Sequence, residues 1–223
     1  MLKTPVIVLN MKTYSESTGK NAFEIAKLMD QISIETGISM AVSVQSIDIK
    51  ECSQKISIPV FAEHIDPIMP GSHTGWILPE AVKLAGASGS LLNHSEHRLN
   101  LADIDYLISR LKDLDLDQIV CSNNIATSKA IASLSPNFVA VEPPELIGGD
   151  ISVTTANPDI VKDSVNAVRD IDKKVKVLCG AGVKNGEDVA KAIELGSVGV
   201  LLASGIIKSK NREKVIRDLI SEV

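Results

Sequence analysis

The chain of 223 residues is poor in aromatic side chains, with one Trp, two Tyr and three Phe. So few aromatics argue against the base-stacking platforms by which proteins bind single-stranded nucleic acid. The 23 Lys and Arg residues are outnumbered by 28 Asp and Glu residues and form no basic block, so we expect no nucleic-acid partner. No apolar run approaches the roughly 18 residues of a membrane-spanning helix, which predicts that the chain has no membrane partner.

Cysteine is also scarce. Cys52, Cys121 and Cys179 are odd in number, lie far apart and lack metal-ligand spacing. The simplest interpretation is three reduced thiols in a cytoplasmic protein. The first residues lead into a short apolar stretch without the small-residue cleavage pattern of a secretory signal, so we interpret this stretch as a first strand.

What the sequence does contain is a regular alternation of two patterns. Nearly continuous apolar, β-branched runs are typical of strands buried on both faces of a parallel sheet, and eight of them lie at 6–9, 40–44, 59–62, 90–93, 118–121, 138–141, 174–178 and 198–202. Amphipathic patterns typical of helices lie between them, at 21–34, 79–84, 101–114, 157–168, 184–195 and 212–220.

Strands that alternate with helices admit two architectures, a closed (β/α)8 barrel or an open doubly wound sheet. The number of strands favours the barrel, as does the lack of a linker rich in Pro, Gly and Ser. No G-x-G-x-x-G motif follows the first strand, where a dinucleotide-binding sheet would carry it. We therefore predict an α/β protein with a single (β/α)8 barrel domain over residues 1–223. Several helices must be short, notably the one between Cys121 and Phe138.

In such a barrel the reactive groups project from the carboxyl ends of the strands. Asn10 and Lys12 follow the first strand, and alternation puts them on the same side of it. His94 and Glu96 follow the fourth strand. His97 adds a second imidazole, but the spacing of the two histidines differs from the i, i+4 pair of a metal-binding helix, so we expect no metal.

Three further strand ends carry candidate groups. Glu142 follows the sixth strand directly and is succeeded by two prolines at 143–144 and two glycines at 148–149, which suits a hinged lid. Small residues at 179–183 and 202–206 follow the last two strands, where backbone N–H groups can approach a phosphate. Each feature alone also fits a surface Lys, a rim His or an ordinary Gly-rich turn.

Taken together, Asn-x-Lys, His-Ser-Glu, Glu-Pro-Pro and the two small-residue turns occur in the order that a barrel requires. On these motifs the whole chain resembles the triosephosphate isomerases, and closely their short archaeal type. The resemblance implies that Asn10 hydrogen-bonds the substrate and that Lys12 supplies positive charge. It implies that His94 is a neutral electrophile, as an imidazole at a helix N-terminus would be, and that Glu142 is the base.

The resemblance also implies the surroundings of these groups. Glu96 would pair with Lys12, and the substrate phosphate would be held by backbone N–H groups near Ile147, Gly182, Ala203 and Ser204. The implied reaction interconverts dihydroxyacetone phosphate and D-glyceraldehyde 3-phosphate through an enediolate, in glycolysis and gluconeogenesis. It needs no metal or organic cofactor. The segment 147–150 reads Ile-Gly-Gly-Asp where the family more often has Gly-Thr-Gly, so the kinetics of the lid stay open.

The sequence leaves alternatives open for the oligomeric state and for the function. The segment 73–75 after the third strand resembles the intersubunit loop of the family, and with the apolar rim at 69–71 it predicts a homo-oligomer, either dimer or tetramer. One competing interpretation is a lyase or synthase that forms a Schiff base at Lys12. Another is a non-catalytic protein on the same scaffold. The presence of Lys12, His94 and Glu142 together favours the isomerase over both.

Overall fold

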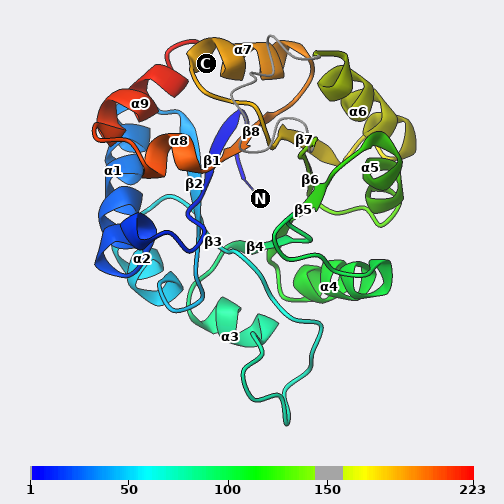
Figure 1. The fold of residues 1–223 in the computed structure, drawn as a ribbon. Helices are drawn as coiled ribbons and strands as arrows, with labels where there is room; N and C mark the ends of the chain where they lie inside the picture. Colours follow the sequence, from blue (N-terminus) through cyan, green and yellow to red (C-terminus); the bar gives the residue numbers. More distant parts are fainter. Residues whose placement is uncertain (1, 144–157) are drawn as a thin grey trace.

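The computed structural model describes residues 2–143 and 158–223, and in it eight parallel strands form a closed barrel (Figure 1). Each strand pairs with its neighbour in the sequence, and β1 closes the barrel by pairing with β8. The strands are β1 Val6–Asn10, β2 Ser39–Val44, β3 Val60–Ala62, β4 Gly89–Leu92, β5 Asp117–Ser122, β6 Phe138–Val141, β7 Lys176–Cys179 and β8 Gly199–Leu202. The predicted (β/α)8 barrel is therefore confirmed.

An outer ring of helices surrounds the strands (Figure 1). The α-helices of the described part are α1 Lys20–Thr36, α2 Ile49–Lys55, α3 Pro79–Leu84, α4 Leu101–Asp113, α5 Ile125–Ala132, α6 Pro158–Ile171, α7 Gly186–Glu194, α8 Ser204–Ile207 and α9 Arg212–Leu219, and the 3-10 helix η1 is Ser15–Ser17. Asparagine side chains cap the N-termini of α4, α5, α7 and α9 by accepting a backbone N–H of the first turn. None of these helices is long and apolar enough to cross a membrane.

The helix between Cys121 and Phe138 is short, as predicted: α5 has eight residues. The sequence analysis did not predict α2, α8 or η1, which have seven, four and three residues. Such segments complete at most two turns, so they are too short for an apolar face to repeat in the sequence.

Alternation along each strand divides the core into two layers. The inward-facing residues form one apolar cluster inside the barrel, which includes Val8, Phe61, Ile119, Phe138 and Leu178. The residues between them in sequence face outward and pack against the helices in a second cluster. Because side chains alternate, the next inward position of each strand lies at its carboxyl end, where the apolar filling gives way to polar groups.

The segment between β3 and α3 projects away from the barrel (Figure 1). Residues 69–76 are exposed, and they include the large apolar side chains of Met69 and Trp76. Asp66 closes the base of the projection, since its carboxylate accepts the Ile77 N–H at 2.5 Å and its own N–H donates to the Ile77 carbonyl at 2.9 Å. An apolar surface held out in this way is typical of a contact between protein chains.

Candidate active site

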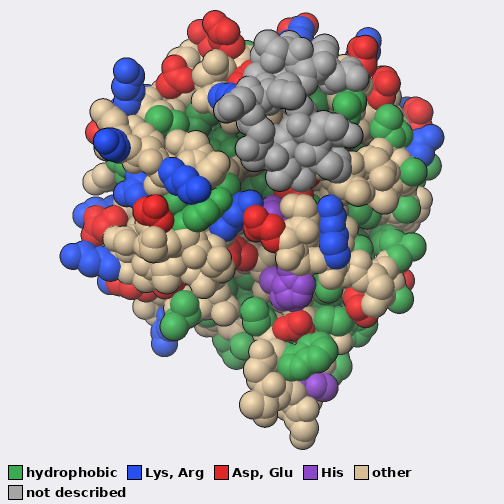
Figure 2. All heavy atoms as spheres, in the orientation of Figure 1, with side chains coloured by type: hydrophobic (Ala, Val, Ile, Leu, Met, Phe, Trp, Pro, Cys, Tyr) green, Lys and Arg blue, Asp and Glu red, His purple; other side chains and the backbone are tan. Residues whose placement is uncertain are grey.

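The predicted site residues gather around one cavity at the carboxyl end of the barrel. The cavity has a volume of about 510 Å³, and the predicted residues that line it are Asn10, Lys12, His94, Glu96, Glu142, Gly182, Ala203 and Ser204. Figure 2 shows acidic, basic and histidine side chains gathered near the centre of this face. Ile147, the remaining predicted phosphate contact, lies outside the described residues.

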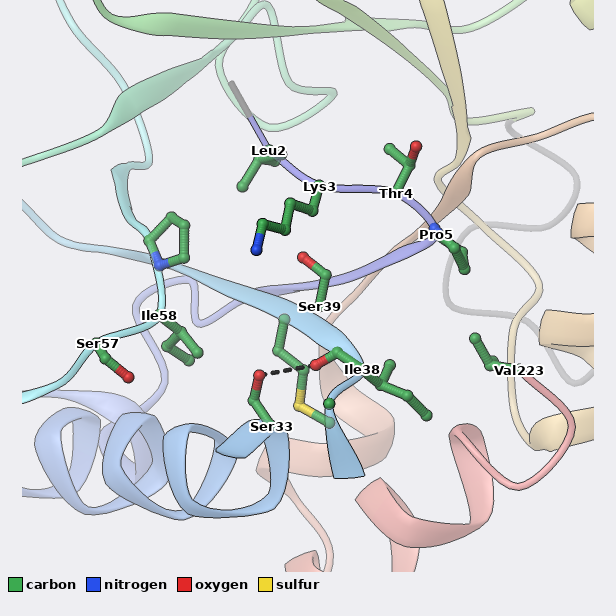
Figure 3. A pocket seen from close by; sticks show the side chains of 13 residues that line it. Leu2, Lys3, Thr4, Pro5, Ser33, Ile38, Ser39, Ser57, Ile58 and Val223 are labelled. Carbon is green, nitrogen blue, oxygen red and sulfur yellow. Dashed lines mark hydrogen bonds between the residues drawn. The ribbon is translucent and has the colours of Figure 1, made fainter. Parts of the chain in front are cut away.

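A larger hollow of about 690 Å³ lies at the opposite end of the barrel, beside the N-terminal segment 2–5 (Figure 3). The described side chains that line it include no His, Cys, Asp or Glu. The Ser33 hydroxyl there donates to the Ile38 carbonyl at 2.7 Å and is engaged in the local fold. Size alone therefore does not identify the reactive cavity, whereas the chemistry of the lining does.

Lys12 is held at the cavity by contacts to both its backbone and its ammonium. Its φ of 51° is left-handed, which costs a side-chain-bearing residue about 1–2 kcal/mol. The Asn10 side chain supports this conformation, because its Oδ1 accepts the Lys12 N–H at 3.0 Å. The Lys12 ammonium forms an ion pair with Glu96 Oε1 at 2.7 Å. The pair predicted between Lys12 and Glu96 is thus present in the structure.

His94 is oriented by the turn that contains it. The Glu96 backbone N–H donates to His94 Nδ1 at 3.2 Å, so Nδ1 acts as the acceptor and Nε2 is the ring nitrogen left to donate into the cavity. The expected helix N-terminus at His94 is wrong, since α4 begins only at Leu101. A turn closed by the His97 N–H and the His94 carbonyl at 2.9 Å supplies the amide instead.

Glu142 faces His94 across the cavity. It follows β6 directly, its N–H donates to the Ser122 carbonyl at 2.7 Å, and only 3% of its surface is exposed. Its Oε1 lies 3.2 Å from His94 Nε2, and its Oε2 is buried with no hydrogen-bond partner among the described residues. Burial and the charge of Glu142 raise the pKa of the Cys121 thiol well above its usual range, so this cysteine remains protonated.

Two residues that the sequence analysis did not assign build this arrangement. A Cβ on Gly180 would lie 2.7 Å from Glu142 Cγ, so glycine leaves the space that the carboxylate side chain occupies. Asn93 fixes the position of the loop that carries His94, because its side chain donates to the Cys121 carbonyl at 2.9 Å and accepts the Leu99 N–H at 3.0 Å. The contacts of Gly180 with Glu142 and of Asn93 with Cys121 have no local signal in the sequence, since each joins the ends of two different strands.

The two small-residue turns lie on the same cavity. Gly182 has a φ of 73°, which a side-chain-bearing residue adopts only with strain. Ser204 begins α8 with Ala203 as its N-cap, and the first N–H groups of a helix have no partner within it.

The His97 side chain does not lie beside that of His94. Its ring stacks on the His64 ring, with the two centroids 3.8 Å apart.

A model of the protein family described as Triosephosphate isomerase matches residues 5–221. The chain belongs to the triosephosphate isomerase family. It is 55% identical over 215 residues to the triosephosphate isomerase of Methanocaldococcus jannaschii, a match that covers 96% of this chain and 98% of that protein. It is 54% identical over 222 residues to that of Methanobrevibacter smithii, with both chains fully covered, and 53% identical over 219 residues to that of Methanothermus fervidus, covering 98% and 99%. The resemblance stated from the motifs is confirmed.

Proposed function

We propose that this member of the isomerase family interconverts dihydroxyacetone phosphate and D-glyceraldehyde 3-phosphate, with Glu142 as the base. The observation that carries the proposal is the 3.2 Å approach of Glu142 Oε1 and His94 Nε2 in a cavity that also receives the Lys12 ammonium. A base, a neutral hydrogen-bond donor and a cation are the three groups that this proton transfer needs.

The reaction moves protons and leaves the oxidation state of the whole molecule unchanged. Glu142 takes the proton from the carbon beside the carbonyl, and the electron pair of the C–H bond forms the C=C bond of an enediolate. The His94 Nε2–H and the Lys12 ammonium stabilise the charge that develops on the carbonyl oxygen. Glu142 then returns its proton to the neighbouring carbon, while the hydroxyl proton shifts between the two oxygens through His94.

The substrate phosphate is assigned to the rim of the cavity. Asn10 and Lys12 approach from the end of β1, and the backbone N–H groups at Gly182, Ala203 and Ser204 approach from the turns after β7 and β8. Backbone N–H groups and an ammonium together suit a phosphate dianion. The contact at Ile147 and the lid that includes it stay predictions.

The alternative of Schiff-base chemistry at Lys12 has less support. Its Nζ lies 2.7 Å from Glu96 Oε1, so an attack on a carbonyl carbon would first require this ion pair to break. Borohydride trapping of a Lys12 adduct in the presence of a triose phosphate would restore that interpretation.

The test is a coupled assay with D-glyceraldehyde 3-phosphate on the wild type and on Glu142→Gln. Glutamine keeps the shape of the side chain but cannot accept the proton, so kcat should fall by a factor on the order of 10²–10⁴. Glu51→Gln is the control, because Glu51 is an exposed carboxylate paired with Lys55 on α2, away from the cavity. Full activity of Glu142→Gln would remove Glu142 as the base.

The proposal extends to assembly and setting. We assign the reaction to glycolysis and gluconeogenesis in the cytoplasm, without a metal or organic cofactor. The exposed projection at residues 69–76 supports a homo-oligomer, in which a neighbouring copy covers Met69 and Trp76. Its size, dimer or tetramer, is to be measured by light scattering.

A further inference from the structure

His64 and His97 form a stacked pair of rings that the proposed mechanism does not use. Their centroids lie 3.8 Å apart, and their planes are inclined by 18°. His64 lies two residues after β3, and His97 lies in the turn after β4 that also contains His94. Neither ring is among the described side chains that line the catalytic cavity. The stack therefore joins the loops after two neighbouring strands, outside the cavity lining.

The His64 ring is held in place on its own side of the stack. The Glu63 N–H donates to the Val44 carbonyl at 3.2 Å, which anchors the backbone after β3 to the end of β2. The His64 side chain is only 11% exposed, and its Nε2 donates to Asp66 Oδ1 at 3.2 Å. Burial lowers the pKa of His64 and outweighs the hydrogen bond to Asp66, which raises it, so the ring is neutral near neutral pH. A second ring can stack on this fixed, neutral ring without charge repulsion.

His97 belongs to the turn that orients His94. The His97 N–H donates to the His94 carbonyl at 2.9 Å, which closes the turn. Within it, the Glu96 N–H donates to His94 Nδ1 at 3.2 Å, and the Glu96 carboxylate pairs with the Lys12 ammonium at 2.7 Å. Residues 96–98 are exposed, so burial does little to fix this part of the turn. The side chain of His97 connects it to His64, which is anchored after β3.

A turn that loses this connection can change the hydrogen bonding of His94. If the Glu96 N–H moves away from Nδ1, the neutral ring can carry its proton on Nδ1 instead of Nε2. Nε2, which lies 3.2 Å from Glu142 Oε1, would then have no proton to donate to the charge that develops on the substrate oxygen. Binding of the phosphate should change little, since the backbone N–H groups assigned to it belong to the turns after β7 and β8.

We infer that His64 and His97 are positioning residues for His94, and that their ring stack holds the turn 94–97 in the form that keeps Nε2 as the donor. The inference rests on the proposed isomerase activity, in which His94 donates to the substrate. It requires a flat ring at position 97, but neither a charge nor a hydrogen-bonding nitrogen there. Loss of the ring should lower kcat and leave KM nearly unchanged.

The first test compares kcat and KM of the wild type, His97→Ala and His97→Phe in the coupled assay at about pH 7.5, where histidine is mostly neutral. Because His97 is exposed, both variants should fold, which circular dichroism checks. Alanine removes the ring, so kcat should fall by about tenfold while KM stays within about twofold. Phenylalanine restores the stack and should return kcat to within about twofold of the wild type. Tyr106→Ala is the matched control, because it removes an exposed aromatic ring from α4 and should leave both constants unchanged.

The second test observes the His94 ring itself. The ¹⁵N NMR shifts of an imidazole distinguish its two neutral tautomers, and comparison with His94→Gln assigns the signals. The wild type and His97→Phe should show a proton on Nε2, whereas His97→Ala should show a mixture of the two tautomers. His64→Ala should produce the same mixture, because it removes the other ring of the stack.

Two kinetic results would overturn the inference: a kcat of His97→Ala equal to that of the wild type, or an equal loss of kcat in His97→Ala and His97→Phe. An unchanged His94 tautomer in His97→Ala would overturn it as well. An inactive wild type would instead refute the proposed function, while the NMR comparison would still decide whether the stack positions His94.

Discussion

Gly180→Ala should lower kcat by displacing Glu142, without changing the chemistry of any reactive group. The added Cβ would lie 2.7 Å from Glu142 Cγ and 3.0 Å from the Val141 carbonyl oxygen. Ordinary contacts of a Cβ begin at about 3.4 Å, so relief requires the Glu142 side chain or the strand end to shift by roughly 0.7 Å or more. Because proton abstraction depends on geometry, a displacement near 1 Å should lower kcat by about 100-fold.

The assay must separate this displacement from loss of fold. Overpacking of this kind costs about 1–3 kcal/mol of stability, so kcat should be measured at saturating substrate well below the unfolding midpoint found by circular dichroism. Gly205→Ala is the matched control on the same rim, since a Cβ there meets no described heavy atom within 4 Å. If folded Gly180→Ala retains kcat within a few-fold of the wild type, the position of Glu142 does not limit the reaction and the assignment of the base is wrong.

Four further outcomes are expected. Glu142→Asp retracts the carboxylate by one methylene and should lower kcat on the order of 100-fold in the coupled assay. Lys12→Met keeps much of the side-chain bulk without the charge and should raise KM and lower kcat together, with an unchanged circular dichroism spectrum. Because the raised pKa of Glu63 means that the folded state loses stability as the pH rises from about 4.5 to about 8, Glu63→Gln should melt at least roughly 2–4 °C higher than the wild type at pH 9, and the gap should close at pH 5. Thr74→Glu puts a charge on the exposed projection and should give monomers by light scattering, with lower activity in the coupled assay. A wild-type protein that is monomeric and active would contradict this prediction.

The order of elements could be predicted because periodicity is a local property of the sequence. Runs that are apolar on both faces mark the eight strands, and their ends mark where Lys12, His94 and Glu142 leave the core. The boundaries differ by a residue or two, as at β7, which was expected at 174–178 and is Lys176–Cys179. Capping and closure of the barrel decide such ends, and neither is encoded in one strand alone.

The residues that support the site could not be predicted in the same way. The orientation of the His94 ring depends on the N–H of Glu96 in a turn and not on a helix, and the space for Glu142 depends on Gly180 at the end of the next strand. Glu63 is the extreme case, because burial, together with the negative charges of Glu96 and Asp48 in other loops, raises its pKa to about 8. In the sequence it is one more glutamate after a short apolar run.

One rule of alternation therefore shapes both the core and the chemistry of this barrel. In β3 the inward positions are Phe61 and then Glu63, and in β6 they are Phe138, Ala140 and then Glu142. Each carboxylate therefore follows an apolar side chain of the barrel interior. That apolar layer covers the two groups from beneath. The two carboxylates then diverge by their partners, since Glu142 meets the donor Nε2 of His94 while Glu63 meets the charges of Asp48 and Glu96. Two carboxyl groups on one layer of the barrel are thus distinguished by the loops that each strand end faces.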